Sequence, residues 1–331
     1  MCSSGILMLD VGGTFIKCSD GRTVPVDSDG SREDIVSSLC LALQSPMEYG
    51  RVAVAIPGPF DYSAGIFRMD HKFAAVKGES FRSLVAEAWT ESETCTASDV
   101  CTASVGSPVS VDSLSSVDSP VSVGRPVCGN HTEPVGCGSP VRLPSGDVEF
   151  RYMHDVNCML LGEMTDGNAR GYRNVALVSL GTGLGFSVCR DGEILCNESG
   201  SPAISIYRMP CRGGILEDYV SKRGFLRGYG RDMTVKKLAD MARGGDSRAA
   251  ERFAETGHIL GSGIAEILKD NGTECLLFGG QISRSFDLFA PAVREELSGV
   301  SCLSRICTIS DFDKAVFKGL QSLWDVSLCK M

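Results

Sequence analysis

Apolar positions near the start of the chain occur in short runs that end in glycines or other turn-forming residues. Residues 5–11 form such a run, and Gly12-Gly13 and a second short run over 14–18 follow it. The turn signal Ser19-Asp20-Gly21 then leads into a third run at 23–26. Apolar runs separated by turn residues are typical of strands, so this segment predicts two consecutive hairpins.

The pattern of strand, glycine-rich turn and hairpin returns in the second half of the chain. An apolar run at 175–180 ends in the sequence Gly-Thr-Gly-Leu-Gly at 181–185. A strand at 186–189, an Asp191-Gly192 turn and a returning strand follow it. Two halves that open in the same way predict a duplicated α/β unit.

Helices and further strands are expected between and after these hairpins. Apolar residues at helical spacing predict helices at 32–43, 81–89, 156–164, 214–220, 234–243 and 247–269, and from about Phe286 and Phe312 onward. Apolar runs predict strands at 51–56, 148–153 and 274–278. The length of 331 residues is about twice that of a typical domain, which favours two domains around one cleft.

Residues 92–147 break this pattern. Ser, Val, Pro and Gly dominate the stretch, and short units such as Ser-Pro-Val recur within it. A repetitive segment with few aromatic residues and no helical or strand periodicity cannot easily offset the entropy lost on ordering. We therefore expect a disordered or loosely ordered insertion, and a regulatory or partner-binding arm is the alternative interpretation.

Composition and charge narrow the classes of partner. The formal net charge of -9 argues against a surface for nucleic acid or anionic membranes, which would need clustered Lys and Arg. No apolar run reaches the roughly 18 to 20 residues that cross a bilayer, and the first strand begins close to Met1 without a basic leader. The 15 cysteines are scattered, which is typical of reduced, buried thiols. These features predict a cytoplasmic protein.

The two glycine-rich turns are candidate phosphate sites. The Gly-x-Gly-x-Gly spacing at 181–185 precedes a hairpin, whereas the dinucleotide fingerprint Gly-x-Gly-x-x-Gly opens directly into a helix. Glycine permits a positive φ and a close approach of backbone N–H groups to an oxyanion, which is the expected reason for glycine at both turns. Either turn alone is more often structural than functional, but their repeated order is much more specific.

These turns and three further segments resemble the ROK (repressor, open reading frame, kinase) family of bacterial sugar kinases, within the actin and hexokinase superfamily. The resemblance covers the whole chain except the insertion. It rests on five segments in the family's order, namely residues 9–17, 56–59, 154–163, 180–185 and 278–283. It implies an α/β fold of the actin-like, hexokinase-like (ribonuclease H-like) type, with two duplicated domains.

The resemblance also implies a division of the chain and a pair of cofactors. Residues 1–91 and 148–157 would form an N-terminal lobe, and residues 158–310 would form a C-terminal lobe. Residues 311–331 would contain a helix that returns to the N-terminal lobe. The cofactors would be ATP and Mg²⁺, the metal arriving with the nucleotide rather than in a cage of protein ligands.

Site residues follow from the same resemblance. Asp155 would be the general base that takes the proton of a sugar hydroxyl, the 6-OH, although Asp also suits a helix N-cap and both roles are compatible. The residues implied to hold the nucleotide and its metal are Asp10, Gly12, Gly13, Thr14, Lys17, Gly181, Thr182, Gly183, Gly185, Gly279, Gly280 and Gln281. Those implied to contact the sugar are Pro57, Gly58, His154, Asp155, Glu198 and Glu217.

Three departures from the family pattern bear on the site. The family's zinc site needs a His where this chain has Ser201, and three cysteines of which only Cys211 remains, so a zinc site is expected to be absent. His154 stands where Asn is common. His71-Lys72-Phe73 replaces an Asn-Leu segment that contacts the sugar. The last two differences leave the preferred sugar open.

The function implied is an ATP-dependent, glucokinase-like sugar kinase with a small sugar as its partner and a homodimer as an option. One alternative is a sugar-binding sensor without catalysis. The family's repressors carry an N-terminal helix-turn-helix, however, and a strand that starts by Ile6 leaves no room for one. The other alternative is an N-acetyl sugar kinase or another phosphotransferase of the same superfamily.

Overall fold

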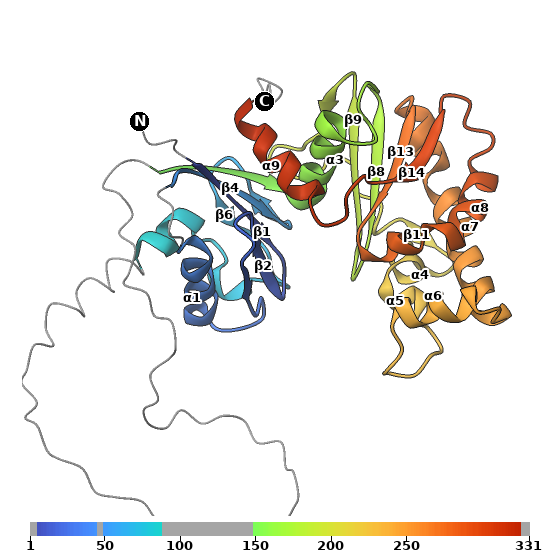
Figure 1. The fold of residues 1–331 in the computed structure, drawn as a ribbon, viewed down its shortest axis with the longest axis horizontal. Coiled ribbons are helices and arrows are strands. Elements are labelled where there is room, and N and C mark those ends of the chain that lie inside the picture. Colours follow the sequence, from blue (N-terminus) through green and yellow to red (C-terminus); the bar gives the residue numbers. More distant parts are fainter. Residues whose placement is uncertain (1–4, 45–48, 88–147, 326–331) are drawn as a thin grey trace, which may run out of the picture.

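A computed structural model gives the fold of this chain and describes residues 5–44, 49–87 and 148–325. Two lobes lie side by side, each built on a five-stranded sheet, and the helices α3 (Asp155–Asp166) and α9 (Ala315–Asp325) lie between them (Figure 1). The predicted insertion at 92–147 lies outside the described residues and stays a prediction.

The first sheet has the strand order β3-β2-β1-β4-β7. Its strands are β1 (Gly5–Val11), β2 (Phe15–Cys18), β3 (Thr23–Pro25), β4 (Tyr49–Ile56) and β7 (Glu149–His154). The first three form antiparallel hairpins, as predicted, and β1, β4 and β7 run parallel. Helix α1 (Arg32–Leu43) has its predicted bounds, and its N-cap Ser31 accepts the amide of Asp34.

The second sheet repeats this arrangement as β10-β9-β8-β13-β14. Its strands are β8 (Val175–Leu180), β9 (Leu184–Arg190), β10 (Glu193–Ile194), β13 (Cys275–Gly279) and β14 (Arg305–Thr308). The directions also match, with β8 antiparallel to β9 and parallel to β13. The predicted duplicated α/β unit is therefore confirmed.

The remaining elements cover the sheets or connect them. The helices are α4 (Glu217–Val220), α5 (Lys222–Phe225), α6 (Val235–Arg243), α7 (Ser247–Asp270) and α8 (Phe286–Glu296), and residues 81–87 are also helical. Short strands and 3-10 turns are β5 (Phe60–Asp61), β6 (Ile66–Phe67), β11 (Pro210–Cys211), β12 (Gly214–Ile215), η1 (Ala74–Val76) and η2 (Gln281–Ser285). Within the described ranges, no helix has both the length and the apolar character to cross a bilayer.

One predicted helix begins later than expected, and strand β14 was missed. The predicted helix at 214–220 begins only at Glu217, because Arg212 and Gly213 adopt φ of 45° and 83° and close the β11–β12 hairpin before it. Strand β14 was not predicted, because its four residues include an arginine, a cysteine and a threonine and so form no apolar run. Its pairing with the buried strand β13 determines its conformation instead.

Helix α3 packs on both sheets. Val156 and Leu160 belong to a buried cluster with residues of β8, β9 and β13 in the C-terminal lobe. Cys158 and Leu161, on another face, pack with residues of β4 and with Leu320 of α9. The C-terminal helix α9 therefore packs on α3 and also directly on the sheet of the N-terminal lobe.

Two glycines and a buried glutamate hold α3 against α9 and the loop before it. A Cβ on Gly319 would overlap the carbonyl oxygen of Cys158, and a Cβ on Gly162 would overlap that of Ala315. Glu163 is fully buried, and its Oε1 accepts the amide of Ser310 at 2.9 Å and its hydroxyl at 2.7 Å. The crossing thus needs backbones in direct contact as well as a satisfied buried carboxylate.

The substitution Gly319→Ala should lower the free energy of unfolding by about 1 to 3 kcal/mol, because the added methyl group forces two helices apart. The loss should occur even though alanine favours a helix by about 1 kcal/mol over glycine. Urea denaturation monitored by circular dichroism measures the free energy of unfolding of each variant. Gly299→Ala is the control, since a Cβ there meets nothing within 4 Å and should change stability by less than about 0.5 kcal/mol. Equal midpoints for the two variants would contradict the tight crossing.

Candidate active site

Asp155 lies where β7 ends and α3 begins. His154, the last residue of β7, pairs with Ile56 of β4, so Asp155 emerges at the carboxyl ends of the parallel strands. Ligand sites of open α/β sheets form at this edge. The Asp155 carboxylate accepts the amide of Val156 at 2.8 Å, and its side chain remains 33% exposed. It therefore stabilises the start of the helix and still faces solvent.

The surroundings of Asp155 keep its carboxylate charged. Burial alone would raise its pKa, but the charge and hydrogen bond of His154 and the amide of Val156 hold that pKa below its usual value, and Lys72 acts in the same direction. His154 Nδ1 lies 2.8 Å from Asp155 Oδ1. An ionised carboxylate at neutral pH is able to accept a proton.

Asp10 supplies a second carboxylate at this edge. It is directly opposite Lys17 of β2 and Ala55 of β4 in the sheet register. Its pKa is raised to about 6, mainly by burial and then by the charge of Asp155, while Lys17 lowers it. A divalent cation would relieve the repulsion between the two acids, and Mg²⁺ prefers carboxylate oxygens and water as ligands. Asp10 therefore fits a role in holding Mg²⁺.

Both predicted phosphate turns keep backbone amides free. In the first turn the Gly12 amide donates to the Phe15 carbonyl at 2.9 Å, whereas the amides of Gly13 and Thr14 have no acceptor among the described residues. In the second turn the Gly181 amide donates to the Gly183 carbonyl at 3.0 Å. The two amides next in sequence, at residues 182 and 183, likewise have no acceptor in the described part of the chain. Free amides in a tight turn suit an anion.

The expected reason for glycine at these turns is wrong in part. Gly12, Gly13, Gly181 and Gly183 have no positive φ. Close neighbours restrict two of them instead, since a Cβ on Gly12 would lie 3.0 Å from the Phe15 oxygen, and one on Gly183 would lie 3.0 Å from an oxygen of Glu217.

Gly280, after β13, does need its special conformation. Its φ is 79°, and a Cβ there would overlap the carbonyl oxygen of Leu180, the last residue of β8. Its neighbour Gly279 pairs with Ser179 of β8. The turn at Gly279 and Gly280 therefore lies directly against the start of the second phosphate turn, and Gln281 follows as an exposed residue of η2.

Glu217 contacts the second phosphate turn. Its Oε2 accepts the amide of Leu184 at 2.9 Å, and its Oε1 accepts a hydrogen bond from Arg223 at 2.9 Å. Arg223 also pairs with Asp218 at 2.8 Å. The carboxylate predicted to bind sugar is thus fixed next to the predicted phosphate turn, with the lone pairs that these bonds leave still able to accept a hydroxyl.

Several of the other predicted sugar residues lie close together. A Cβ on Gly58, in the Pro57-Gly58-Pro59 turn, would lie 3.3 Å from Cδ2 of His154 and 3.4 Å from Oγ of Ser201. The loop of Ser201 also carries Glu198, whose side chain is exposed. The Tyr62 amide donates to the Ser199 carbonyl at 2.9 Å, so this loop of the C-terminal lobe docks on the N-terminal lobe beside His154.

Sequence reasoning did not assign a role to Lys72 or Arg223. A Cβ on Gly13 would lie 3.5 Å from Cε of Lys72, which places this lysine over the first predicted phosphate turn. Its signal in the sequence is the replacement of the family's Asn-Leu segment by His71-Lys72-Phe73. No motif includes Arg223, so only the three-dimensional contacts identify it.

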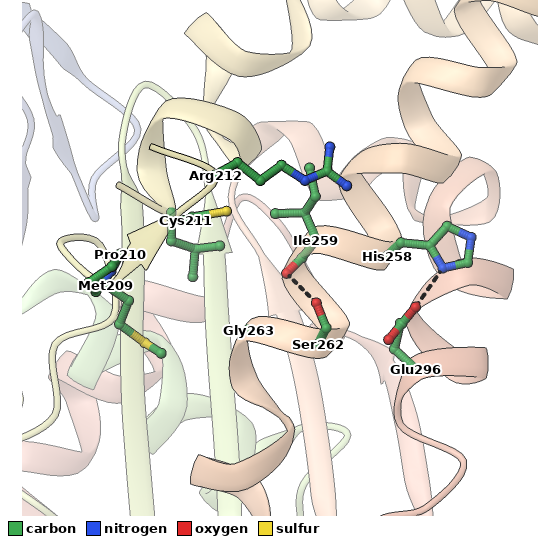
Figure 2. A pocket seen from close by; sticks show the side chains of 10 residues that line it. Met209, Pro210, Cys211, Arg212, His258, Ile259, Ser262, Gly263 and Glu296 are labelled. Atoms are coloured by element: carbon green, nitrogen blue, oxygen red, sulfur yellow. Dashed lines mark hydrogen bonds and ion pairs between the residues drawn. The ribbon is translucent and has the colours of Figure 1, made fainter. Parts of the chain in front are cut away.

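A cavity of about 300 Å³ lies elsewhere in the C-terminal lobe (Figure 2). It is lined by Met209, Pro210, Cys211, Arg212, Leu216, His258, Ile259, Ser262, Gly263 and Glu296. His258 Nδ1 and Glu296 Oε1 lie 2.9 Å apart at its wall. No residue predicted for nucleotide or sugar binding lines it, so the cavity is separate from the candidate active site.

Comparisons with known proteins agree with the motifs. The ROK family pattern matches residues 145–302. An N-acetyl-D-glucosamine kinase of Pectobacterium carotovorum is 26% identical over 182 residues, which cover 47% of this chain and 60% of that protein. The matches span only 51% to 60% of the lengths of the first curated relatives.

Solved structures match over nearly the whole chain. A ROK family glucokinase of Streptomyces griseus, in complex with glucose and AMPPNP, superposes with a TM-score of 0.66 at 18% identity and covers 96% of this chain and 98% of that one. A ROK family transcriptional regulator, a homologue of the E. coli MLC protein, has a TM-score of 0.64 at 14% identity over 97% of this chain and 79% of that one. The resemblance expected from the motifs is therefore confirmed: residues 145–302 carry the ROK family pattern, and the chain has the mixed α/β two-domain fold of the ROK sugar kinases.

Proposed function

We propose that this chain is an ATP-dependent sugar kinase that transfers the γ-phosphoryl group to a hexose hydroxyl, with Asp155 as the general base. One observation carries the proposal. An ionised, partly exposed carboxylate stands at the carboxyl ends of the parallel strands, next to a second acid and within one fold that also holds two turns with free amides. That set of groups matches the needs of phosphoryl transfer.

The nucleotide phosphates would bind at the two turns. The free amides of Gly13, Thr14, Thr182 and Gly183 would donate to phosphate oxygens, as amides of backbone nests do. Asp10 on β1 and Lys17 on β2 lie opposite each other. The ammonium group of Lys17 would face phosphate, while Asp10 would hold Mg²⁺ through water. When bound, Mg²⁺ neutralises phosphate charge.

Asp155 would perform the proton transfer. Its carboxylate accepts the proton of the sugar hydroxyl while that oxygen forms a bond to the γ-phosphorus. The bond between this phosphorus and the β,γ-bridging oxygen breaks, and ADP leaves with the bonding electron pair. His154 and the Val156 amide hold the carboxylate in place and charged, which avoids reorganisation during the step.

The sugar would lie beside His154 and the Pro57-Gly58-Pro59 turn. Glu198 and Glu217 would accept its hydroxyl hydrogen bonds, since a carboxylate accepts several. The relatives named as a glucokinase and an N-acetyl-D-glucosamine kinase support a hexose or an N-acetylhexosamine, and we take glucose phosphorylated at the 6-OH as the default. ATP as donor is supported by the AMPPNP complex of the similar glucokinase.

A non-catalytic sugar sensor is the second candidate, because a ROK family transcriptional regulator shares the fold. The fold alone does not distinguish the two functions. Sugar binding without turnover in the parent chain would favour the sensor.

The substitution Asp155→Asn should lower kcat by about 10² to 10⁴, because the amide accepts no proton at neutral pH. Affinities for sugar and nucleotide should change little. A coupled assay of ADP release with a panel of hexoses and N-acetylhexosamines measures the rate, and calorimetry measures binding.

Asp166→Asn is the matched control for this experiment. Asp166 is the last residue of the same helix, its side chain is 79% exposed, and it pairs with Lys318 on the surface. It should leave kcat and stability nearly unchanged. Sugar-stimulated turnover that survives Asp155→Asn would exclude this residue as the base.

The substitution His154→Asn should move the acidic limb of the kcat/KM profile to higher pH. The charge and hydrogen bond of His154 hold the pKa of Asp155 down, so their loss lets burial raise that pKa. A larger fraction of the base is then protonated at a given acidic pH, and activity is lost earlier as the pH falls. Rates measured between about pH 5 and 9 give the profile.

His258→Asn provides the comparison for the pH profile. His258 is paired with Glu296 at the wall of the separate cavity, so this change should leave the profile in place. A profile that stays fixed or moves to lower pH in His154→Asn would refute the coupling between His154 and Asp155.

A further inference from the structure

Lys72 lies over the first phosphate turn, and the proposed reaction has so far given it no role. A Cβ on Gly13 would lie 3.5 Å from its Cε and 3.6 Å from its Cδ. The aliphatic stem therefore runs along a turn whose amides at Gly13 and Thr14 are free. A lysine can pack its aliphatic stem against the protein while its ammonium group reaches a polar partner.

The backbone holds Lys72 in this place. The next residue, Phe73, has a φ of 51° and a ψ of 27°, which is uncommon for a residue other than glycine. Its amide donates to the Ser28 carbonyl at 2.6 Å, and the Ser28 amide donates to the Gly13 carbonyl at 3.2 Å. The Phe73 ring is fully buried against Phe67 at 5.6 Å between centroids. A left-handed residue kept by burial and hydrogen bonds is typical of a functional loop.

The charge of Lys72 acts on Asp155 and has no hydrogen-bonding or ion-pair partner among the described residues. Within the described ranges Lys72 makes no hydrogen bond or ion pair, whereas Lys77, five residues on, pairs with Asp70. The charge nevertheless acts on Asp155, since it helps to lower the pKa of that carboxyl. The stem of Lys72 thus lies against the turn that would hold the donor phosphates, and its charge acts on the carboxylate that would activate the acceptor.

We propose that Lys72 is a catalytic residue whose ammonium binds the phosphoryl group as it passes from ATP to the sugar. This inference rests on the proposed kinase function. The phosphorus–oxygen bond to the sugar forms as the bond to ADP breaks, and the hydroxyl proton goes to Asp155. Lys72 gains and loses no proton, and it neutralises negative charge on the equatorial oxygens of the group in transfer.

Contact with the sugar alone is the competing role, because Lys72 stands where the family pattern has a sugar-contact segment. The packing of the stem on Gly13 favours the phosphoryl group, because Gly13 belongs to the phosphate turn. A residue that bound only the sugar would lie beside the Pro57-Gly58-Pro59 turn and His154 instead.

Lys72→Met tests the proposal, since methionine keeps the length of the stem and removes the charge. The expected result is a fall in kcat of about a hundredfold, similar to the loss of one charge-stabilising donor, with an unchanged sugar affinity. The variant should also lose several-fold in affinity for the nonhydrolysable analogue AMPPNP but not for ADP, because only the former carries a γ-phosphate. Lys72→Arg should recover part of the rate, as it keeps the charge.

The pH dependence separates this role from an effect through Asp155. If Lys72 only lowered the pKa of Asp155, the loss in Lys72→Met would disappear at high pH, where the base is ionised in both proteins. A loss that stays constant up to about pH 9 supports direct contact with the phosphoryl group. A loss that disappears, or a higher KM for sugar with the parent kcat, would overturn it.

A control variant and a binding measurement distinguish failure of the Lys72 proposal from failure of the kinase proposal. Lys77→Met removes a lysine of the same loop that is 50% exposed, and it should change kcat by less than about twofold. If the parent chain shows no sugar-stimulated ADP release, the kinase proposal and the catalytic role of Lys72 both fail, and the AMPPNP and ADP affinities then decide only whether Lys72 binds the γ-phosphate. Equal preference for AMPPNP over ADP in the parent and in Lys72→Met would reject the role of Lys72, even if the parent is an active kinase.

Discussion

Helix α3 has to pack against both sheets at once, and its first residue is the carboxylate at the edge between them. Val156 and Leu160 pack with the C-terminal lobe, and Cys158 and Leu161 pack with α9 and the N-terminal lobe. Any shift of the helix to suit one sheet would disturb the other, because packed interiors tolerate little displacement. The buried Glu163 fixes the far end through Ser310. The position of Asp155 is therefore determined by packing rather than by its own loop.

The sequence predicted most of this architecture, because its signals are local. Paired glycines and Asp-Gly steps marked the hairpins of both halves, and the capped helix α1 has its predicted bounds. The errors arise where distant partners decide the conformation. Residues 214–215 pair with β11 in a hairpin before the helix begins, and β14 is a strand because β13 lies beside it. Periodicity over a few residues cannot report either partner.

The candidate site likewise combines features that the sequence predicted with features that only the structure shows. The order of the motifs predicted the roles of Asp10, Asp155 and the two turns. The physical reason for the glycines in those turns became apparent only in the three-dimensional structure. Gly183 is restricted by an oxygen of Glu217, which is distant in sequence, and Gly280 is restricted by the carbonyl of Leu180. Motif reasoning marked Lys72 only as part of a segment that departs from the family pattern and gave it no role. Residues that act through long-range contacts are the ones a single sequence hides.

The charged side chains around Asp10 and Asp155 act on each other. Burial raises the pKa of Asp10, and repulsion by Asp155 raises it further. His154 and Lys72 act on Asp155, and Lys17 acts on Asp10, so each acid has its own source of positive charge. Removing one member of a buried ion pair lowers stability more than removing both members. His154 and Lys72 therefore form one electrostatic arrangement, in which both side chains hold the pKa of Asp155 down and Lys72 also lies against the turn at Gly13.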